Sequence, residues 1–152
     1  MTQVDFYILP DGPEDGRLRL ACRLADKAVQ SKLGVFVLAK TEADARKLDE
    51  LLWTVTQNSF LPHRYVWDTD EAAVEEPILI GCLERAHSAP TEQATGMRWD
   101  LMINLSDEVP ETFERYQRLA EVVDGEPERR ERGRERYRYY RDRGYALKAH
   151  QL

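Results

Sequence analysis

The stretch "VDFYILPDGPEDGRLRLACRLADKAVQSKLGVFVLA", residues 4–39, has the pattern of a strand, a helix and a second strand. It begins with a short apolar run, Val4–Pro10, which is rich in β-forming residues and ends in the turn sequence "PDGP", so it predicts a buried strand. Apolar residues then recur every three or four positions from Glu14 onward, which is the period of a helix with one buried side. Gly34 stands at the expected C-cap of this helix, and Val35–Ala39 predicts a second buried strand.

The alternation of strand and helix continues beyond this stretch. Residues 40–53, "KTEADARKLDELLW", begin with a capping Thr41 and place acidic residues in the first turn, so they predict a second helix. We therefore expect an α/β fold: a single-domain, Rossmann-like, mostly parallel sheet joined by right-handed crossovers and flanked by helices. Further apolar strands are expected at residues 77–83 and 100–105, and a short one near Tyr65.

Three further segments complete the expected domain, which spans residues 1–152. The polar residues 84–99 predict a surface loop. Residues 107–124 predict a helix, because Pro110 falls near its first turn and five apolar side chains then share one side. These are Phe113, Tyr116, Leu119, Ala120 and Val123. Gly125–Pro127 then breaks the chain before an arginine-rich helix expected at about residues 127–144.

Composition argues against several classes of protein. No apolar run approaches the roughly 20 residues that a membrane span needs, and the N-terminus lacks the features of a secretory signal, so we expect a cytoplasmic protein without membrane contact. Cys22 and Cys82 lie far apart, and the three histidines are scattered. This spacing predicts buried thiols and no metal site.

The turn after the first strand is unsuited to a nucleotide. The sequence "ILPDGPEDGR" contains Gly12 and Gly16 but neither of the glycine-rich phosphate-binding motifs. Asp11, Glu14 and Asp15 would repel a phosphate at this position. We therefore expect a sheet without a nucleotide-binding loop, and no cofactor.

Catalytic motifs are also missing from the sequence. There is no Gly-x-Ser-x-Gly elbow, and carboxylate pairs such as Asp49 and Glu50 are adjacent, so they do not converge on a helix. We expect no catalytic residues and no enzyme. An enzyme of the α/β class stays open as an alternative, because catalytic groups can also meet from distant segments.

Charge is distributed unevenly along the chain. Residues 1–128 contain 13 basic and 25 acidic residues and carry a net charge of −12, whereas residues 129–152 contain 9 and 3 and carry +6. On a helix of 3.6 residues per turn, four arginines and one tyrosine of the last segment fall within about 100° of one another. This arginine ridge consists of Arg130, Arg134, Tyr137, Arg138 and Arg141. Tyr139 or Tyr140, on another side, is expected to pack the helix onto the domain.

The arginine ridge suits two kinds of ligand. A single nucleic-acid strand could place phosphates on the arginines and a base on Tyr137. An acidic peptide could place its carboxylates on the arginines and an apolar residue beside the ring. The alternative is a solvated helix whose arginines pair with Glu131, Glu135 and Asp142. The acidic remainder of the chain favours a short acidic peptide over a long polyanion.

A second candidate surface follows the second predicted helix. Large apolar and aromatic side chains are concentrated within "WTVTQNSFLPHRY", residues 53–65. They include Trp53, Phe60, Leu61 and His63. Such a cluster is either a cover over the core or a protein-binding face, because aromatic anchors dominate interface energetics.

Taken in order, several short stretches resemble the chi subunit of bacterial DNA polymerase III, part of the clamp-loader assembly. They are "VDFYIL", "LDELLW" with "FLPH" seven residues after its Trp, "WDLMINL", "EVVD" and "RERYRYYRDRGYAL". The resemblance covers nearly the whole chain. It implies a Rossmann-like fold that needs no nucleotide, and an accessory subunit that is not catalytic.

The resemblance also implies partners. Chi subunits bridge the clamp loader, through a small subunit called psi, to the acidic C-terminal tail of single-stranded DNA-binding protein, and so associate indirectly with single-stranded DNA. The family's tail-binding residues match Arg130, Arg134, Tyr137 and Arg138, and the ridge geometry adds Arg141. The surface that faces psi, or another clamp-loader component, matches Trp53, Phe60 and His63, with Leu61 beside them. Direct binding of single-stranded nucleic acid to the arginine helix is the alternative function.

Overall fold

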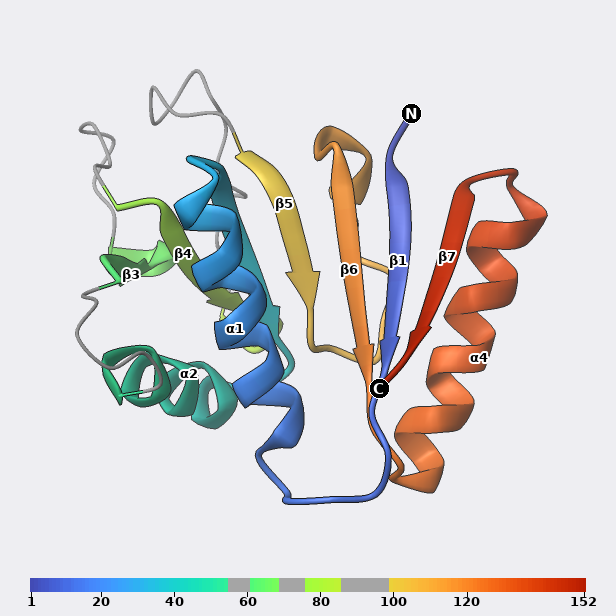
Figure 1. Cartoon of the computed structure of the whole chain (residues 1–152), viewed down its shortest axis with the longest axis horizontal. Coiled ribbons are helices and arrows are strands. Elements are labelled where there is room, and N and C mark those ends of the chain that lie inside the picture. Colours follow the sequence, from blue (N-terminus) through green and yellow to red (C-terminus); the bar gives the residue numbers. More distant parts are fainter. Residues whose placement is uncertain (55–60, 69–75, 86–98) are drawn as a thin grey trace.

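The computed structural model describes residues 1–54, 61–68, 76–85 and 99–152, and these form one seven-stranded sheet. Its strands run in the order β3-β4-β2-β5-β6-β1-β7, and every neighbouring pair is parallel (Figure 1). The strands are β1 (Gln3–Ile8), β2 (Gly34–Ala39), β3 (His63–Tyr65), β4 (Ile78–Cys82), β5 (Trp99–Asn104), β6 (Arg118–Val123) and β7 (Ala146–Gln151). The expected Rossmann-like parallel α/β fold is confirmed.

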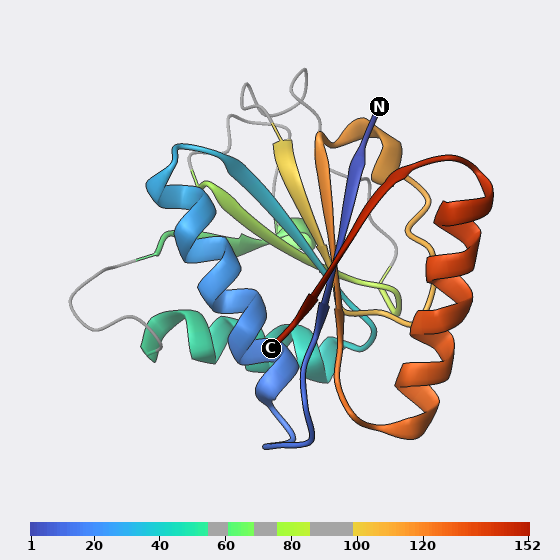
Figure 2. The same ribbon diagram turned by 45° about the vertical axis from the view of Figure 1, so that its right-hand side comes forward.

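Helices cover both faces of this sheet. Helices α1 (Gly16–Gln30) and α2 (Glu42–Thr54) pack on one face, and α4 (Pro127–Asp142) packs on the other, over β6 and β1 (Figures 1 and 2). Each face has its own hydrophobic core because strand side chains alternate. Leu48 of α2 lies in the first core and Tyr140 of α4 in the second.

The helix boundaries follow the sequence signals with one exception. Thr41 caps α2 as predicted, since its hydroxyl accepts a hydrogen bond from the backbone N–H of Asp44 at 3.1 Å. The prediction of Gly34 as the C-cap of α1 is wrong. The helix ends at Gln30, the chain reverses at Lys32 with a positive φ of 62°, and Gly34 already belongs to β2.

The predicted helix at residues 107–124 is also wrong. A short 3-10 helix, Phe113–Arg115, is followed by strand β6, which pairs with β5 on one side and β1 on the other. The apolar residues of this segment fit a helical period, but "LAEVV" is equally a continuous run that suits a central parallel strand buried on both faces. Such short runs are ambiguous from period alone.

The C-terminal strand β7 was not predicted. It follows α4 after a turn in which Gly144 has a φ of 80°, and it lies at the edge of the sheet beside β1. The short strand expected near Tyr65 is confirmed as β3, which forms the other end of the strand order. Most of the expected loop at residues 84–99 falls outside the described residues. Within the described part of the chain, no helix is both long and apolar enough to cross a membrane.

Candidate functional site

The N-terminus of α4 is fixed by two carboxylates. Glu126 is the N-cap, and its side chain accepts hydrogen bonds from the backbone N–H groups of Glu128 and Arg129 at 3.1 and 2.8 Å, which lower the pKa of Glu126. Asp124 accepts two hydrogen bonds from the Arg129 guanidinium, at 2.9 and 2.8 Å. Burial raises the pKa of Asp124, but Arg129 and the backbone N–H of Glu126 outweigh it, so the pKa lies below its usual value.

A buried polar network holds the middle of α4 against β6. The carboxylate of Glu121 accepts hydrogen bonds from Arg136 at 3.1 Å and from the Tyr140 hydroxyl at 2.6 Å. The Asn104 amide of β5 donates to the same carboxylate at 3.0 Å. Burial raises the pKa of Glu121, while Arg136 and the hydrogen bonds oppose this shift. These contacts fix which side of the helix faces away from the sheet.

Gly133 allows α4 to approach β6 closely. A Cβ atom at this position would lie 2.9 Å from Cγ2 of Val123, which is closer than real side chains pack. Because glycine has no Cβ, the helix backbone rests directly on the valine. Gly133 and Val123 also line a hollow between α4 and the sheet.

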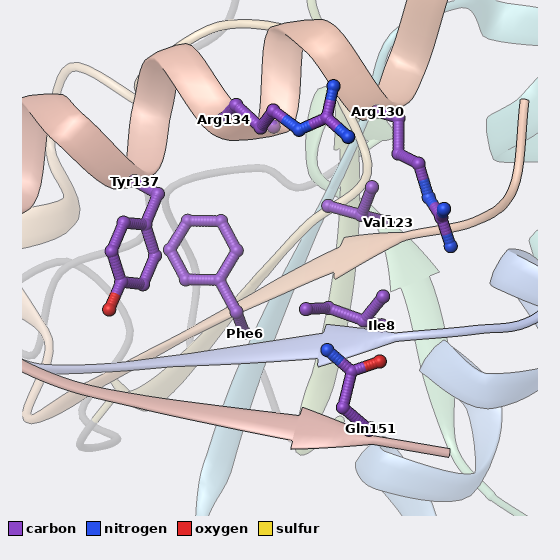
Figure 3. Close-up of a pocket in the computed structure, with 8 residues that line it drawn as sticks. Phe6, Ile8, Val123, Arg130, Arg134, Tyr137 and Gln151 are labelled. Carbon is purple, nitrogen blue, oxygen red and sulfur yellow. The ribbon is translucent and has the colours of Figure 1, made fainter. Parts of the chain in front are cut away.

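This hollow is a pocket of about 300 Å³ between α4 and the strands β6, β1 and β7 (Figure 3). Its base is apolar and comes from Phe6, Ile8 and Val123. Arg130 and Arg134 extend from α4 on one side, and Gln151 of β7 lies on the other. The pocket therefore combines an apolar floor with two guanidinium groups at its rim. This arrangement suits a ligand with an apolar end and nearby carboxylates.

Tyr137 forms one wall of the pocket. Its ring meets the edge of Phe6 with a centroid distance of 5.3 Å and an interplanar angle of 63°, and the residue keeps 37% of its surface exposed. The ring is thus held in place by an aromatic contact on one side and open on the other.

The predicted arginine ridge is divided by the structure. Arg130, Arg134 and Tyr137 line the pocket, whereas Arg138 and Arg141 are exposed on α4 but are not among its lining residues. Tyr140 packs the helix onto the domain, as expected.

Some ridge arginines pair with acids of their own helix. Arg134 lies 3.3 Å from Glu131, and Arg141 lies 3.2 Å from Asp142, in pairs with side chains at least 55% exposed. Exposed pairs of this kind contribute little, so they leave the guanidinium of Arg134 open to exchange its partner. Among the described residues, no acidic side chain pairs with Arg130 or Arg138.

The apolar half of the pocket was not predicted from the sequence. The missed lining residues are Phe6, Ile8, Val123, Gly133 and Gln151. Three of them are strand residues that were expected to be buried or helical, and Gln151 lies on the strand that was not predicted. The only available signal was Gly133, a glycine in the middle of a strongly helical segment.

The second candidate surface surrounds Trp53 at the end of α2. Trp53 is 56% exposed, and its ring meets the edge of the His63 ring at a centroid distance of 4.9 Å. The His63 side chain is only 1% exposed, with its ring nitrogens 2.6 Å from the Leu61 carbonyl oxygen and 2.8 Å from the Asp49 carboxylate. The histidine thus links the start of β3 to α2, through Asp49, and contacts the tryptophan ring.

The other two residues predicted for this surface differ in placement. Leu61 is buried at 4% exposure and belongs to the core beneath α2, so it supports the surface without being part of it. Phe60 lies outside the described residues. Of the residues predicted for this surface that the structure describes, Trp53 is the one that exposes a large apolar side chain.

The carboxyl end of β1 has acidic surroundings. A pocket of about 360 Å³ there is bordered by Asp11, Glu14, Asp124, Glu126 and Arg129. Four carboxylates beside one guanidinium disfavour a phosphate group. Over the described ranges, no cluster of three or more histidine, cysteine or acidic side chains could hold a metal ion.

Comparison with known protein families gives one match over most of the chain. Residues 1–148 match the family described as DNA polymerase III chi subunit, HolC. The DNA polymerase III subunit chi of Pseudomonas aeruginosa is 36% identical over 152 residues, which cover all of this chain and 98% of that protein. The subunits chi of Haemophilus influenzae and Escherichia coli are 29% and 26% identical, over 93% and 97% of this chain and 92% and 96% of their own lengths.

A solved structure supports the fold assignment alone. The crystal structure of T4 UvsW superimposes with a TM-score of 0.70 over 99% of this chain, at 10% sequence identity. This chain spans 41% of that protein. The likeness places the sheet and helices in a known α/β arrangement, and it carries no information on the pocket beneath α4.

Proposed function

Because the chain belongs to the DNA polymerase III chi subunit family, we propose that it uses the pocket beneath α4 to bind the acidic C-terminal tail of single-stranded DNA-binding protein. A chi subunit is an accessory subunit of a replicative polymerase. In this role the chain is an adaptor and catalyses no reaction. The observation that carries the proposal is the apolar floor flanked by Arg130 and Arg134.

The pocket chemistry supports a peptide that ends in an apolar residue. Phe6, Ile8 and Val123 would remove an apolar side chain from water, which contributes roughly 1.5–3 kcal/mol for a large residue. Arg130 and Arg134 would bind the terminal carboxylate and neighbouring acidic side chains, because guanidinium groups form two-pronged hydrogen bonds with carboxylates. Arg138 and Arg141 lie further along the helix and would add attraction at longer range.

Bare single-stranded nucleic acid is a less suitable ligand for the same pocket. Successive bases of a strand stack on successive aromatic side chains, whereas Tyr137 is the one partly exposed aromatic ring among the described residues that line this pocket, because Phe6 is only 2% exposed. The rest of the chain carries a net charge of −12, which would repel a long polyanion. Binding to bare oligonucleotide is therefore the outcome that would favour the alternative function.

A peptide titration tests the proposal. The unmodified protein and the variants Arg130→Ala and Arg134→Ala are titrated with a peptide of the tail sequence, by calorimetry at low salt. A charge-assisted hydrogen bond contributes about 1.5–3 kcal/mol, so each variant should bind at least about tenfold more weakly. A peptide without its terminal apolar residue should also bind at least about tenfold more weakly, because it leaves the floor unoccupied.

Arg132→Ala is the matched control for this titration. Arg132 lies on the same helix, is similarly exposed and pairs with Glu135, but it does not line the pocket. Its removal changes the net charge equally and should leave the affinity within about twofold. If all three substitutions weakened peptide binding equally, the cause would be the loss of net positive charge. That result would contradict a specific site in the pocket.

We also propose that the Trp53 surface contacts the psi subunit or another clamp-loader component. Support comes from the exposed tryptophan braced by a nearly buried histidine, which is typical of an anchor residue at an interface. This surface lies on α2, across the sheet from the pocket beneath α4 (Figure 2). Two partners bound on opposite faces would be linked by one rigid domain.

A further inference from the structure

Strand β7 is the outermost strand on its side of the sheet. It pairs with β1 from Gln3↔Ala146 to Ile8↔Gln151, and among the described residues no strand pairs with its other edge (Figures 1 and 2). The strand is also open to solvent, since Ala146, Ala149 and Gln151 are exposed. An edge of this kind presents unpaired N–H and C=O groups that can accept a further strand.

The hydrogen-bond pattern identifies which backbone groups are presented. The N–H of Leu152 donates to the carbonyl oxygen of Ile8 at 3.0 Å, so residue 152 is directed toward β1. In a parallel strand, alternate residues direct their backbone groups to opposite neighbours. Ala149 and Gln151 therefore direct their N–H and C=O groups to the free edge, away from the sheet.

These same residues lie beside the pocket. Gln151 lines the hollow beneath α4, and side chains two positions apart share a face of the strand, so Ala149 faces α4 as well. Lys148 and His150 lie on the opposite face, where His150 stacks on Tyr7 with ring centroids 4.7 Å apart. The free backbone edge thus begins at the pocket and has basic side chains of α4 on one side and Lys148 on the other.

We propose that an acidic peptide bound in the pocket pairs with β7 as an additional strand of the sheet, through the backbone groups of Ala149 and Gln151. This inference depends on the proposed function, because it describes how the same peptide is held. Alternate side chains of the added strand would face the arginines of α4, and the others would face Lys148. Backbone pairing would supply affinity that is independent of peptide sequence, and the pocket would supply specificity for the chain end.

The positive charge around β7 favours an acidic peptide over a second copy of the chain as the added strand. Residues 129–152 carry a net charge of +6, so a second copy of β7 would bring like charges together, whereas an acidic peptide brings opposite charges. Pairing between two copies of the chain is thus disfavoured. The experiment below distinguishes such dimerisation from peptide binding.

The test replaces the outward N–H of Ala149. Proline is tolerated on an edge strand where its nitrogen faces solvent, so Ala149→Pro should remove one intermolecular hydrogen bond while the sheet persists. Ala149→Val is the matched control, since it adds bulk but keeps the N–H. Ala149→Pro should bind the acidic peptide about fivefold to tenfold more weakly than Ala149→Val, with circular dichroism confirming that both are folded.

Hydrogen exchange provides a second measurement that needs no substitution. Bound peptide should slow exchange of the Ala149 and Gln151 amides. N-methylation of the peptide at successive residues should weaken binding at every second position, because only alternate peptide N–H groups face β7. This scan remains informative if Ala149→Pro fails to fold.

The outcomes separate this inference from the proposed function. Tight peptide binding with equal affinity in both Ala149 variants and unchanged exchange would overturn strand pairing and leave the pocket in place. Failure of the unmodified protein to bind the peptide would overturn the proposed function itself. Dimerisation in sedimentation experiments that Ala149→Pro abolishes, without an effect on the peptide, would overturn the inference in favour of a second copy.

Discussion

The Nε atom of Arg136 lies 3.1 Å from Oε1 of Glu121, so a guanidinium of α4 pairs with a carboxylate of β6 inside the protein. Their side chains are 5% and 0% exposed. Removing two such charges from water costs several kcal/mol per ion, and the pair offsets this only with good geometry and further hydrogen bonds. Tyr140 and Asn104 supply those bonds. The pair therefore fixes the rotation of α4 and, with it, the direction of Arg130 and Arg134.

Removal of the Glu121 carboxylate should strongly destabilise the domain. Glu121→Ala leaves the guanidinium of Arg136 buried without its partner, and breaking a buried pair in this way typically costs about 3–5 kcal/mol. Urea denaturation monitored by circular dichroism measures the free energy of unfolding. The double variant Glu121→Gln/Arg136→Met should recover much of the loss, because glutamine can still accept from Tyr140 and no charge remains buried. A double variant as unstable as Glu121→Ala would show that the charge is not the cause.

Gly133→Ala should loosen α4 from the sheet despite the better helix propensity of alanine. The new Cβ would lie 2.9 Å from Cγ2 and 3.2 Å from Cγ1 of Val123, which cannot move aside easily. Overpacking of this kind costs about 1–3 kcal/mol, whereas the change from glycine to alanine gains about 1 kcal/mol in a helix. We expect a net loss of about 0–2 kcal/mol in urea denaturation, together with weaker peptide binding.

Val123→Ala in the same chain is the control for Gly133→Ala. It provides room for the new methyl group, so the double variant should be more stable than the sum of the two single changes predicts. Strict additivity would mean that the two side chains do not meet, and would contradict the close approach of helix and strand.

Sequence patterns predicted the elements whose signal is local. Helix α2 has its capping Thr41 and an acidic first turn, and the strands β1 and β2 are short apolar runs bounded by turn residues. Strand β6 was mistaken for a helix because its apolar residues fit both periods. Its identity depends on β1 and β5, which lie on either side of it and are distant in the sequence.

Only those residues of the candidate site that lie close together in the sequence were predicted. Helical spacing alone brought Arg130, Arg134 and Tyr137 to one side of α4, but it gave no sign of the apolar floor. Phe6 is more than 120 residues away in the chain and meets Tyr137 only because β1 lies next to β6. Strand β7, whose alanine, lysine and glutamine residues lack a strand pattern, takes its conformation from pairing with β1.

Acid should weaken the N-terminal anchoring of α4. The pKa values of Asp124 and Glu126 are lowered in the folded protein, so their stabilising contribution is complete above their unfolded pKa values of about 4 and is lost as the pH falls through the lower folded values. Melting temperatures measured from pH 7 to pH 3 should therefore fall below about pH 4. Asp124→Asn should have a lower melting temperature than the unmodified protein at pH 7. Its melting temperature should then fall by less as the pH is lowered. An identical pH dependence in both proteins would exclude Asp124 as a contributor.

Trp53→Ala should weaken binding at one proposed surface without affecting the other. More than half of the tryptophan is exposed, so its removal should cost the fold only about 1 kcal/mol, much less than a buried residue of this size. Loss of an interface anchor typically costs 2 kcal/mol or more, so capture of clamp-loader subunits should fall about thirtyfold. Arg134→Ala should leave this capture unchanged, and Trp53→Ala should leave peptide binding unchanged. If Trp53→Ala unfolds the domain, the tryptophan is a cover over the core.

The effect of salt on peptide binding should differ between arginines that line the pocket and arginines that do not. Arg138 is exposed beyond the lining, so it should act on an acidic peptide only at a distance, and such attraction is screened within about 10 Å at 0.1 M salt and about 3 Å at 1 M. Arg138→Ala should thus weaken binding about twofold to threefold at low salt, with no effect at 0.5 M. Arg134→Ala should still weaken binding at 0.5 M, since a direct hydrogen bond to a carboxylate is screened less. Calorimetric titrations of both variants at the two salt concentrations measure this difference. An effect of Arg138→Ala that persists at high salt would mean that the ligand extends along α4 toward its C-terminus, beyond the pocket.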